Sequence, residues 1–286
     1  MSGSRSVTGA NLSRTAGFGS RSVLGGAMVL VIGVGVEASR LPSVPGPPGP
    51  RYVATQLDCA GFRERSRSDL QTYVAGRARR EVVGIDAEWR FRAAPARADT
   101  VALEGWLDTL SVWRRSEEDS VAPDTDGIIG GRYRGLLSGD GRYRADVRPF
   151  VPDPLLEVAD LSRALEDLLP RLPPRPLAVG ETWGDGAGLE IRRLADSAGA
   201  QGVQRFRLTL RRDVSEARLR GDSLPLRLRQ SVREDGTFAW QTQAGLISRE
   251  RNVTVDTYVP AEARVGRPVQ ARIEQRITLE RMEQGC

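Results

Sequence analysis

Most of residues 51–286 alternates apolar and polar side chains with a period of two. In residues 88–92, for example, Trp89 and Phe91 fall on one face and the charged residues fall on the other. The same alternation recurs over residues 204–212, 224–232 and 269–279. A period of two predicts β-strands, and strands that are half apolar and half charged are typical of antiparallel sheets with one face in water. We therefore predict an antiparallel β domain over residues 51–286.

Two turn motifs predict hairpins within this domain. The sequence SGDG (138–141) separates two nearly identical segments, GRYRG (131–135) and GRYRA (141–145), which we interpret as two arms of one hairpin. The sequence EDGT (234–237) contains the Asp-Gly pair that favours a tight turn, so we expect a second hairpin there.

Residues 153–170 change to helical spacing. Asp153 is the expected N-cap, Pro154 suits the first helical position, and Pro170 ends the pattern. A stripe of apolar residues runs along one side of this helix, near 154–169: Val158, Leu161, Leu165 and Leu168. The predicted fold class is mainly β with one helix (α+β): a curved antiparallel sheet or half-open barrel, with the helix packed on its concave face.

The segment PPRPLAVGETWGDG (173–186) follows the predicted helix directly. Its prolines turn the chain away from the helix, and Trp183 supplies a large apolar ring where the chain re-enters the sheet. We interpret the segment as a hinge, with Trp183 filling the seam between the helix and the second set of strands.

The first fifty residues have the composition of an export signal and a tether. Residues 1–22 are basic and contain no acid, residues 23–36 are apolar, and small residues precede a cleavage position after Ala38. This pattern predicts a signal peptide over 1–38, and the apolar run is shorter than a bilayer-spanning helix. Residues 39–50 are a Pro/Gly-rich linker. We expect an exported protein, periplasmic or extracellular, with tethering by an uncleaved N-terminal segment as the alternative.

Export would place both cysteines, Cys59 and Cys286, in an oxidising compartment. A bridge between them would join the two ends of the domain, and two independent thiols are the alternative.

The basic residues exclude several chemistries. The chain contains no histidine and no lysine, so all 42 basic residues are arginine. A Ser-His-Asp triad, a histidine-ligated zinc, a lysine Schiff base and a Walker-type phosphate loop are therefore impossible. The net charge is +5, but positive and negative residues are interspersed, which is typical of a solvated surface. We predict no nucleic-acid partner.

Acidic residues offer the remaining candidate chemistry. Asp124 and Asp126 in PDTDGIIGG (123–131) could belong to a metal loop, a carboxylate pair or a polar turn, and the composition favours the turn. Glu181 and Asp185 form a second acidic pair with no fixed separation. We predict no catalytic, cofactor-binding or metal-binding residues and no cofactor.

The segment LPPRPLAVGETW (172–183) resembles an element found in a group of secreted bacterial β-rich proteins of unknown function, with the form P-L-P-x-x-P-V-x-x-G-x-x-W. Residues 235–256 resemble a hairpin of the same group, with alanine where the group often has threonine. The resemblance implies a curved, half-open antiparallel sheet of the lipoprotein-carrier type, which cups an apolar ligand. It implies no catalytic residues.

These observations predict an exported cell-envelope binding or scaffold protein that is not an enzyme and holds a lipid or other apolar ligand between sheet and helix. The alternatives are an extracytoplasmic carboxylate-dependent hydrolase and an arginine-rich sheet that binds anionic envelope components.

Overall fold

The computed structural model describes residues 49–74, 76–97, 99–196, 202–217, 226–261 and 266–283. The predicted signal peptide, most of the linker and Cys286 lie outside these residues. Within the described ranges, no helix has the length and apolar character needed to cross a membrane.

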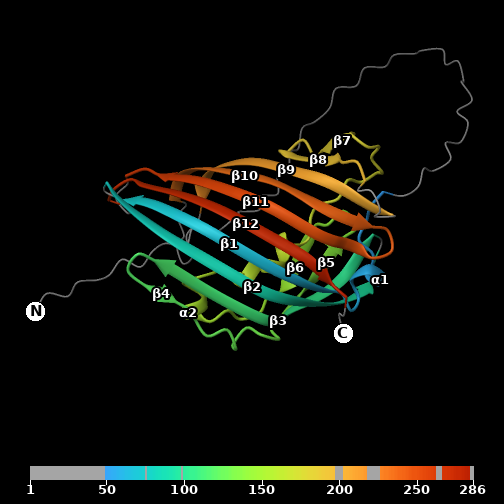
Figure 1. Ribbon diagram of the computed structural model, residues 1–286, viewed down its shortest axis with the longest axis horizontal. Coiled ribbons are helices and arrows are strands. Elements are labelled where there is room, and N and C mark those ends of the chain that lie inside the picture. The colour runs from blue at the N-terminus through green and yellow to red at the C-terminus, as the bar shows by residue number, and fades with distance from the viewer. Residues whose placement is uncertain are drawn as a thin grey trace, which may run out of the picture.

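The fold is one open, curved sheet of twelve strands, all paired antiparallel (Figure 1). The first set of strands is β1 (Gly61–Val74), β2 (Arg77–Pro95), β3 (Thr100–Ser116), β4 (Ser120–Val121), β5 (Arg132–Ser138) and β6 (Tyr143–Val147). The second set is β7 (Thr182–Gly184), β8 (Leu189–Arg193), β9 (Val203–Ala217), β10 (Leu226–Gln241), β11 (Gly245–Val259) and β12 (Val269–Met282). The prediction of a mainly β, antiparallel fold is confirmed.

The order across the sheet is β6-β5-β3-β2-β1-β12-β11-β10-β9-β8-β7, and β4 pairs with β3. The first and last long strands therefore meet in the middle of the sheet, where β1 lies beside β12 (Figure 1). The edges of the sheet are β6 and β7, which are neighbours in sequence. The connection between them, residues 148–181, must consequently pass from one edge of the sheet to the other.

This connection, which we call the crossing segment, covers part of one sheet face. It contains three short helical pieces, α2 (Asp153–Leu156), η1 (Leu161–Arg163) and α3 (Ala164–Leu168). Its leucines are buried in one cluster with Trp89 and Phe91 of β2. We call the face that packs against the crossing segment the inner face, and the opposite face the outer face.

The prediction of a single continuous helix over 154–169 is wrong, because the three short pieces α2, η1 and α3 occupy this segment instead. Asp160 has extended backbone angles, and its carboxylate accepts a hydrogen bond from the Ser162 N–H at 3.0 Å. This local side-chain cap competes with helix continuation and divides the segment. The predicted N-cap is also shifted, because Pro152 occupies that position and Asp153 is the first helical residue. The buried leucine stripe itself is confirmed at Leu161, Leu165 and Leu168.

Polar side chains of the sheet, together with Tyr52 before the first strand, hold the crossing segment by its backbone. The Tyr133 hydroxyl donates to the Leu161 carbonyl at 2.7 Å, and the Tyr52 hydroxyl donates to the Pro170 carbonyl at 3.1 Å. Arg249 of β11 donates to the carbonyls of Asp167 and Leu168, at 2.7 and 3.0 Å. Tyr52 precedes a helical turn that the sequence pattern did not reveal, α1 (Ala54–Leu57).

One of the two predicted hairpins is present. Residues 138–141 connect β5 to β6, as expected. The turn predicted at 234–237 is wrong, because these residues lie inside β10. A side chain at Gly236 would place its Cβ 2.4 Å from the Glu250 carbonyl oxygen, so this glycine permits close approach of β11. Trp183 lies on edge strand β7 and packs, partly buried, against the main core.

The two ends of the described domain are adjacent, because Gly61 pairs with Met282. Cys59 is disulfide-bonded. The predicted partner, Cys286, lies outside the described residues.

Candidate functional site

Beyond the packed core, the inner face carries a row of aliphatic side chains. Leu70, Ile273, Val255 and Val232 stand in register across β1, β12, β11 and β10. Each is half-buried, and none belongs to the two hydrophobic clusters that the described residues form. The row is flanked by charged residues in the same register, Glu81 on β2 and Arg212 on β9. We call Leu70, Ile273, Val255 and Val232 the aliphatic row.

A polar belt separates the aliphatic row from the packed core. Arg249 pairs with Glu234 at 2.7 Å, and Arg251 lies 3.7 Å from the same carboxylate. Glu64 accepts a hydrogen bond from the Trp89 indole N–H at 2.8 Å. Burial raises the pKa of the Glu64 carboxyl, and the hydrogen bond from Trp89 opposes this shift. Burial also lowers the pKa of Arg249.

Replacing Glu64 by glutamine is expected to stabilise the protein relative to the wild type at neutral pH. Because the pKa of Glu64 is raised above its ordinary 4.5, the native state binds more protons than the unfolded state in this range. The contribution of this carboxyl to stability is therefore present at low pH and is lost as the pH rises through the folded-state pKa. Urea unfolding from pH 4 to pH 8 measures the difference. A stability difference that does not change with pH would contradict the assignment.

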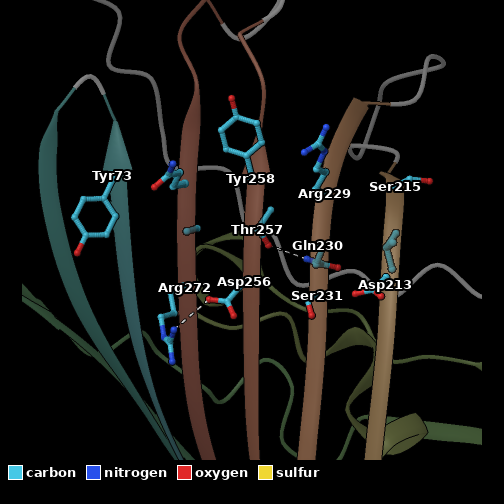
Figure 2. A pocket seen from close by; sticks show the side chains of 13 residues that line it. Tyr73, Asp213, Ser215, Arg229, Gln230, Ser231, Asp256, Thr257, Tyr258 and Arg272 are labelled. Atoms are coloured by element: carbon cyan, nitrogen blue, oxygen red, sulfur yellow. Dashed lines mark hydrogen bonds and ion pairs between the residues drawn. The ribbon is translucent and has the colours of Figure 1, made fainter. Parts of the chain in front are cut away.

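The outer face is hollowed at the end of the strands away from the core. A groove of about 840 Å³ runs across β1, β12, β11, β10 and β9 (Figure 2). Because side chains alternate along a strand, two cross-strand rows point outward here. The first row is Tyr73, Gln270, Tyr258 and Arg229, and the second is Arg272, Asp256, Ser231 and Asp213. Ser215 also lines the groove, at the irregularity in the β9–β10 pairing. The backbone between the two rows forms the floor of the groove.

The two arginines that line the groove differ in their ion pairs. Arg272 lies 3.5 Å from Asp256 and 2.8 Å from Glu274. Arg229, in contrast, has no ion pair or hydrogen bond with another described side chain. Tyr73 and Tyr258 are among the exposed large hydrophobic residues of the described chain, at 45% and 38%. The groove therefore combines aromatic surface, hydrogen-bonding groups, and one arginine and one aspartate, Arg229 and Asp213, that form no ion pair with a described residue.

The acidic residues singled out in the sequence take part in local turns. The Asp124 carboxylate accepts the Asp126 N–H at 2.9 Å, and both residues are exposed. Glu181 pairs with Arg175 at 2.6 Å, and Asp185 accepts the N–H groups of Ala187 and Leu189. Among the described residues, no three His, Cys, Asp or Glu side chains gather as a metal site would require.

The aliphatic row and the outer groove were not identified from the sequence. The signal for both was the period-two alternation, which assigns each side chain to a face. The alternation does not reveal the order of the strands in the sheet. That order places β1 beside β12, so both surfaces are formed by strands from the two ends of the described domain.

The fold and these surfaces define a class of architecture: an open antiparallel sheet crossed on its inner face by its own central connection. No family model and no curated protein matches the chain. A solved structure of lipovitellin, described as showing lipid–protein interactions, is similar over 80% of this chain at 11% identity, with a TM-score of 0.43. The similar part is 26% of the lipovitellin chain. A match at this TM-score carries no argument about function.

Proposed function

We propose that the protein is an exported binding protein of the cell envelope that holds the acyl chain of a lipid on its inner face. The observation that carries the proposal is the aliphatic row. Its four side chains are in register and half-buried, and no cluster of the described core includes them. A contiguous apolar surface left outside a core is a common feature of binding sites.

The dimensions and flanks of the row favour a linear amphipathic ligand. Four neighbouring strands span three strand spacings, or about 14 Å, which accommodates an extended hydrocarbon chain laid across the strands. Each methylene buried contributes roughly 0.8 kcal/mol. At one end of the row, Glu81 is paired with Arg79 at 3.1 Å. At the other end, Arg212 is exposed and has no ion pair with a described residue, so it suits an anionic headgroup.

The test combines ligand identification with binding. Mass spectrometry of an organic extract of the purified native protein is expected to detect bound lipid, and titration with a fluorescent fatty acid is expected to saturate. The double variant Val255→Thr/Ile273→Thr retains β-branched side chains but makes the row polar. Its affinity for the fatty acid is expected to fall at least tenfold, which corresponds to about 1.4 kcal/mol.

The outer-face variant Thr254→Val, which alters the residue next to Val255 on the same strand, serves as the control and is expected to bind normally. An unchanged affinity in the double variant would overturn the proposal. So would a native dimer that the double variant dissociates, because a second copy of the chain would then be the occupant of the row.

A further inference from the structure

We propose that the outer groove binds an acidic glycan, a polysaccharide segment that carries carboxylate or phosphate groups. This site lies on the opposite face from the aliphatic row and does not depend on the lipid proposal. The argument rests on the placement of the two tyrosines, on the hydrogen-bonding groups between them and on the unpaired arginines.

The tyrosines provide two stacking surfaces at one level of the sheet. Tyr73, Gln270 and Tyr258 occupy adjacent strands in direct register, so the two tyrosines are about 10 Å apart, two strand spacings. Figure 2 shows the Tyr73 ring beside β1 and the Tyr258 ring over β11, with the two hydroxyl groups pointing in opposite directions along the strands. Exposed aromatic rings that contribute nothing to a core are suited to pack against the C–H-bearing face of a sugar ring.

Between and beside the rings lie groups that both donate and accept hydrogen bonds. Gln270, Ser231 and Ser215 line the groove together with the carboxylates of Asp213 and Asp256. A mixture of amide, hydroxyl and carboxylate groups on a shallow floor complements a ligand that is rich in hydroxyl groups. A purely apolar ligand would leave these groups without partners.

The surface next to the groove holds excess positive charge. Arg233 and Arg211 stand directly opposite each other across β10 and β9, both are exposed, and neither has an ion pair with a described residue. Like charges directly opposite on a sheet are destabilising. Arg229, two residues before Ser231 on β10, is also unpaired. Three arginines without partners beside one groove favour an anionic ligand, because guanidinium groups bind carboxylate and phosphate in a forked geometry.

The two aspartates inside the groove favour an acidic glycan over a nucleic acid. Asp213 and Asp256 would repel a polymer with a phosphate on every unit, such as a nucleic acid. A glycan in which acidic sugars alternate with neutral ones bears its charges farther apart, so an acidic group can reach Arg229 while neutral hydroxyls face the aspartates.

The test measures binding of oligosaccharides bearing uronate groups, phosphate groups or no charge, by isothermal titration calorimetry at low and physiological salt. We expect binding to a charged oligosaccharide at least tenfold tighter than to its neutral counterpart, and weakening as salt rises. Tyr258→Ala is expected to reduce the affinity at least tenfold, and Tyr258→Phe to retain it. Arg229→Gln is expected to abolish the preference for the charged ligand.

Arg67→Gln removes an exposed outer-face arginine of β1 away from the groove, and it is expected to bind like the wild type. Three outcomes would overturn the proposal: no binding to any charged oligosaccharide, equal affinity for charged and neutral ones, or a loss in Arg67→Gln as large as in Arg229→Gln. Binding of anionic lipid vesicles or DNA that depends on Arg229, without glycan binding, would also overturn it.

Discussion

Replacing Arg249 by methionine is expected to lower the free energy of unfolding by about 3–5 kcal/mol. The Arg249 guanidinium is 9% exposed and donates to two carbonyls of the crossing segment, as well as to Glu234. Methionine preserves much of the side-chain volume but leaves Glu234 as a buried carboxylate and the two carbonyls without their donor. Removing one partner of a buried pair costs more than removing both.

Urea denaturation of three variants tests this account. The double variant Arg249→Met/Glu234→Gln is expected to recover part of the loss, because it no longer buries a carboxylate whose remaining ion pair is the longer one with Arg251. Arg276→Met breaks an exposed pair with Glu250 on the outer face, and its effect is expected to stay within about 1 kcal/mol. Equal losses in Arg249→Met and Arg276→Met would mean that Arg249 does not anchor the crossing segment.

Replacing Trp89 by alanine is expected to cost a similar amount, about 3–5 kcal/mol. The indole is 1% exposed, and its ring centre lies 6.4 Å from that of Phe91 and 5.4 Å from that of Tyr133. The change opens a large cavity beneath the crossing segment, and it also removes the N–H that donates to Glu64. Cavity formation and loss of a buried hydrogen bond act in the same direction.

Trp106 provides a matched control for Trp89. It lies on β3 on the outer face, half-buried, with the Arg132 guanidinium 3.8 Å above its ring. Trp106→Ala is expected to destabilise the protein by a smaller amount, because water can occupy the space it leaves. Chemical denaturation with tryptophan fluorescence measures both variants. A larger loss for Trp106→Ala would contradict the assignment of the two faces.

The long strands with apolar–charged alternation were predictable because each of them carries its own signal. Trp89 and Phe91 alternate with charged neighbours, and the structure places both on the inner face. The crossing segment was predictable in its burial but not in its backbone. Its leucines have helical spacing. The break before Asp160 accompanies local hydrogen bonds from the Ser162 N–H and hydroxyl to the Asp160 carboxylate, which the leucine spacing does not reveal. The Asp-Gly pair at 235–236 was misleading because a glycine serves a tight turn and a close strand approach equally well.

The candidate surfaces were not predictable for a different reason. Leu70 and Ile273 are about two hundred residues apart in sequence, yet they are neighbours in the aliphatic row. Tyr73 and Tyr258 are also far apart in sequence, yet both line the groove. Alternation assigns each residue to a face, but register between distant strands is a property of the assembled sheet.

The pairing of β1 with β12 has a consequence for how the chain folds. Fourteen residue pairs in continuous register join the first long strand to the last one, in the centre of the sheet. Contacts between such distant parts of a chain raise the contact order, and folding slows as contact order increases. The sheet cannot close at its centre until β12 has been synthesised. Until then, the edge of β1 that will receive β12 stays open as an unpaired strand edge, which is a surface prone to pairing with other chains.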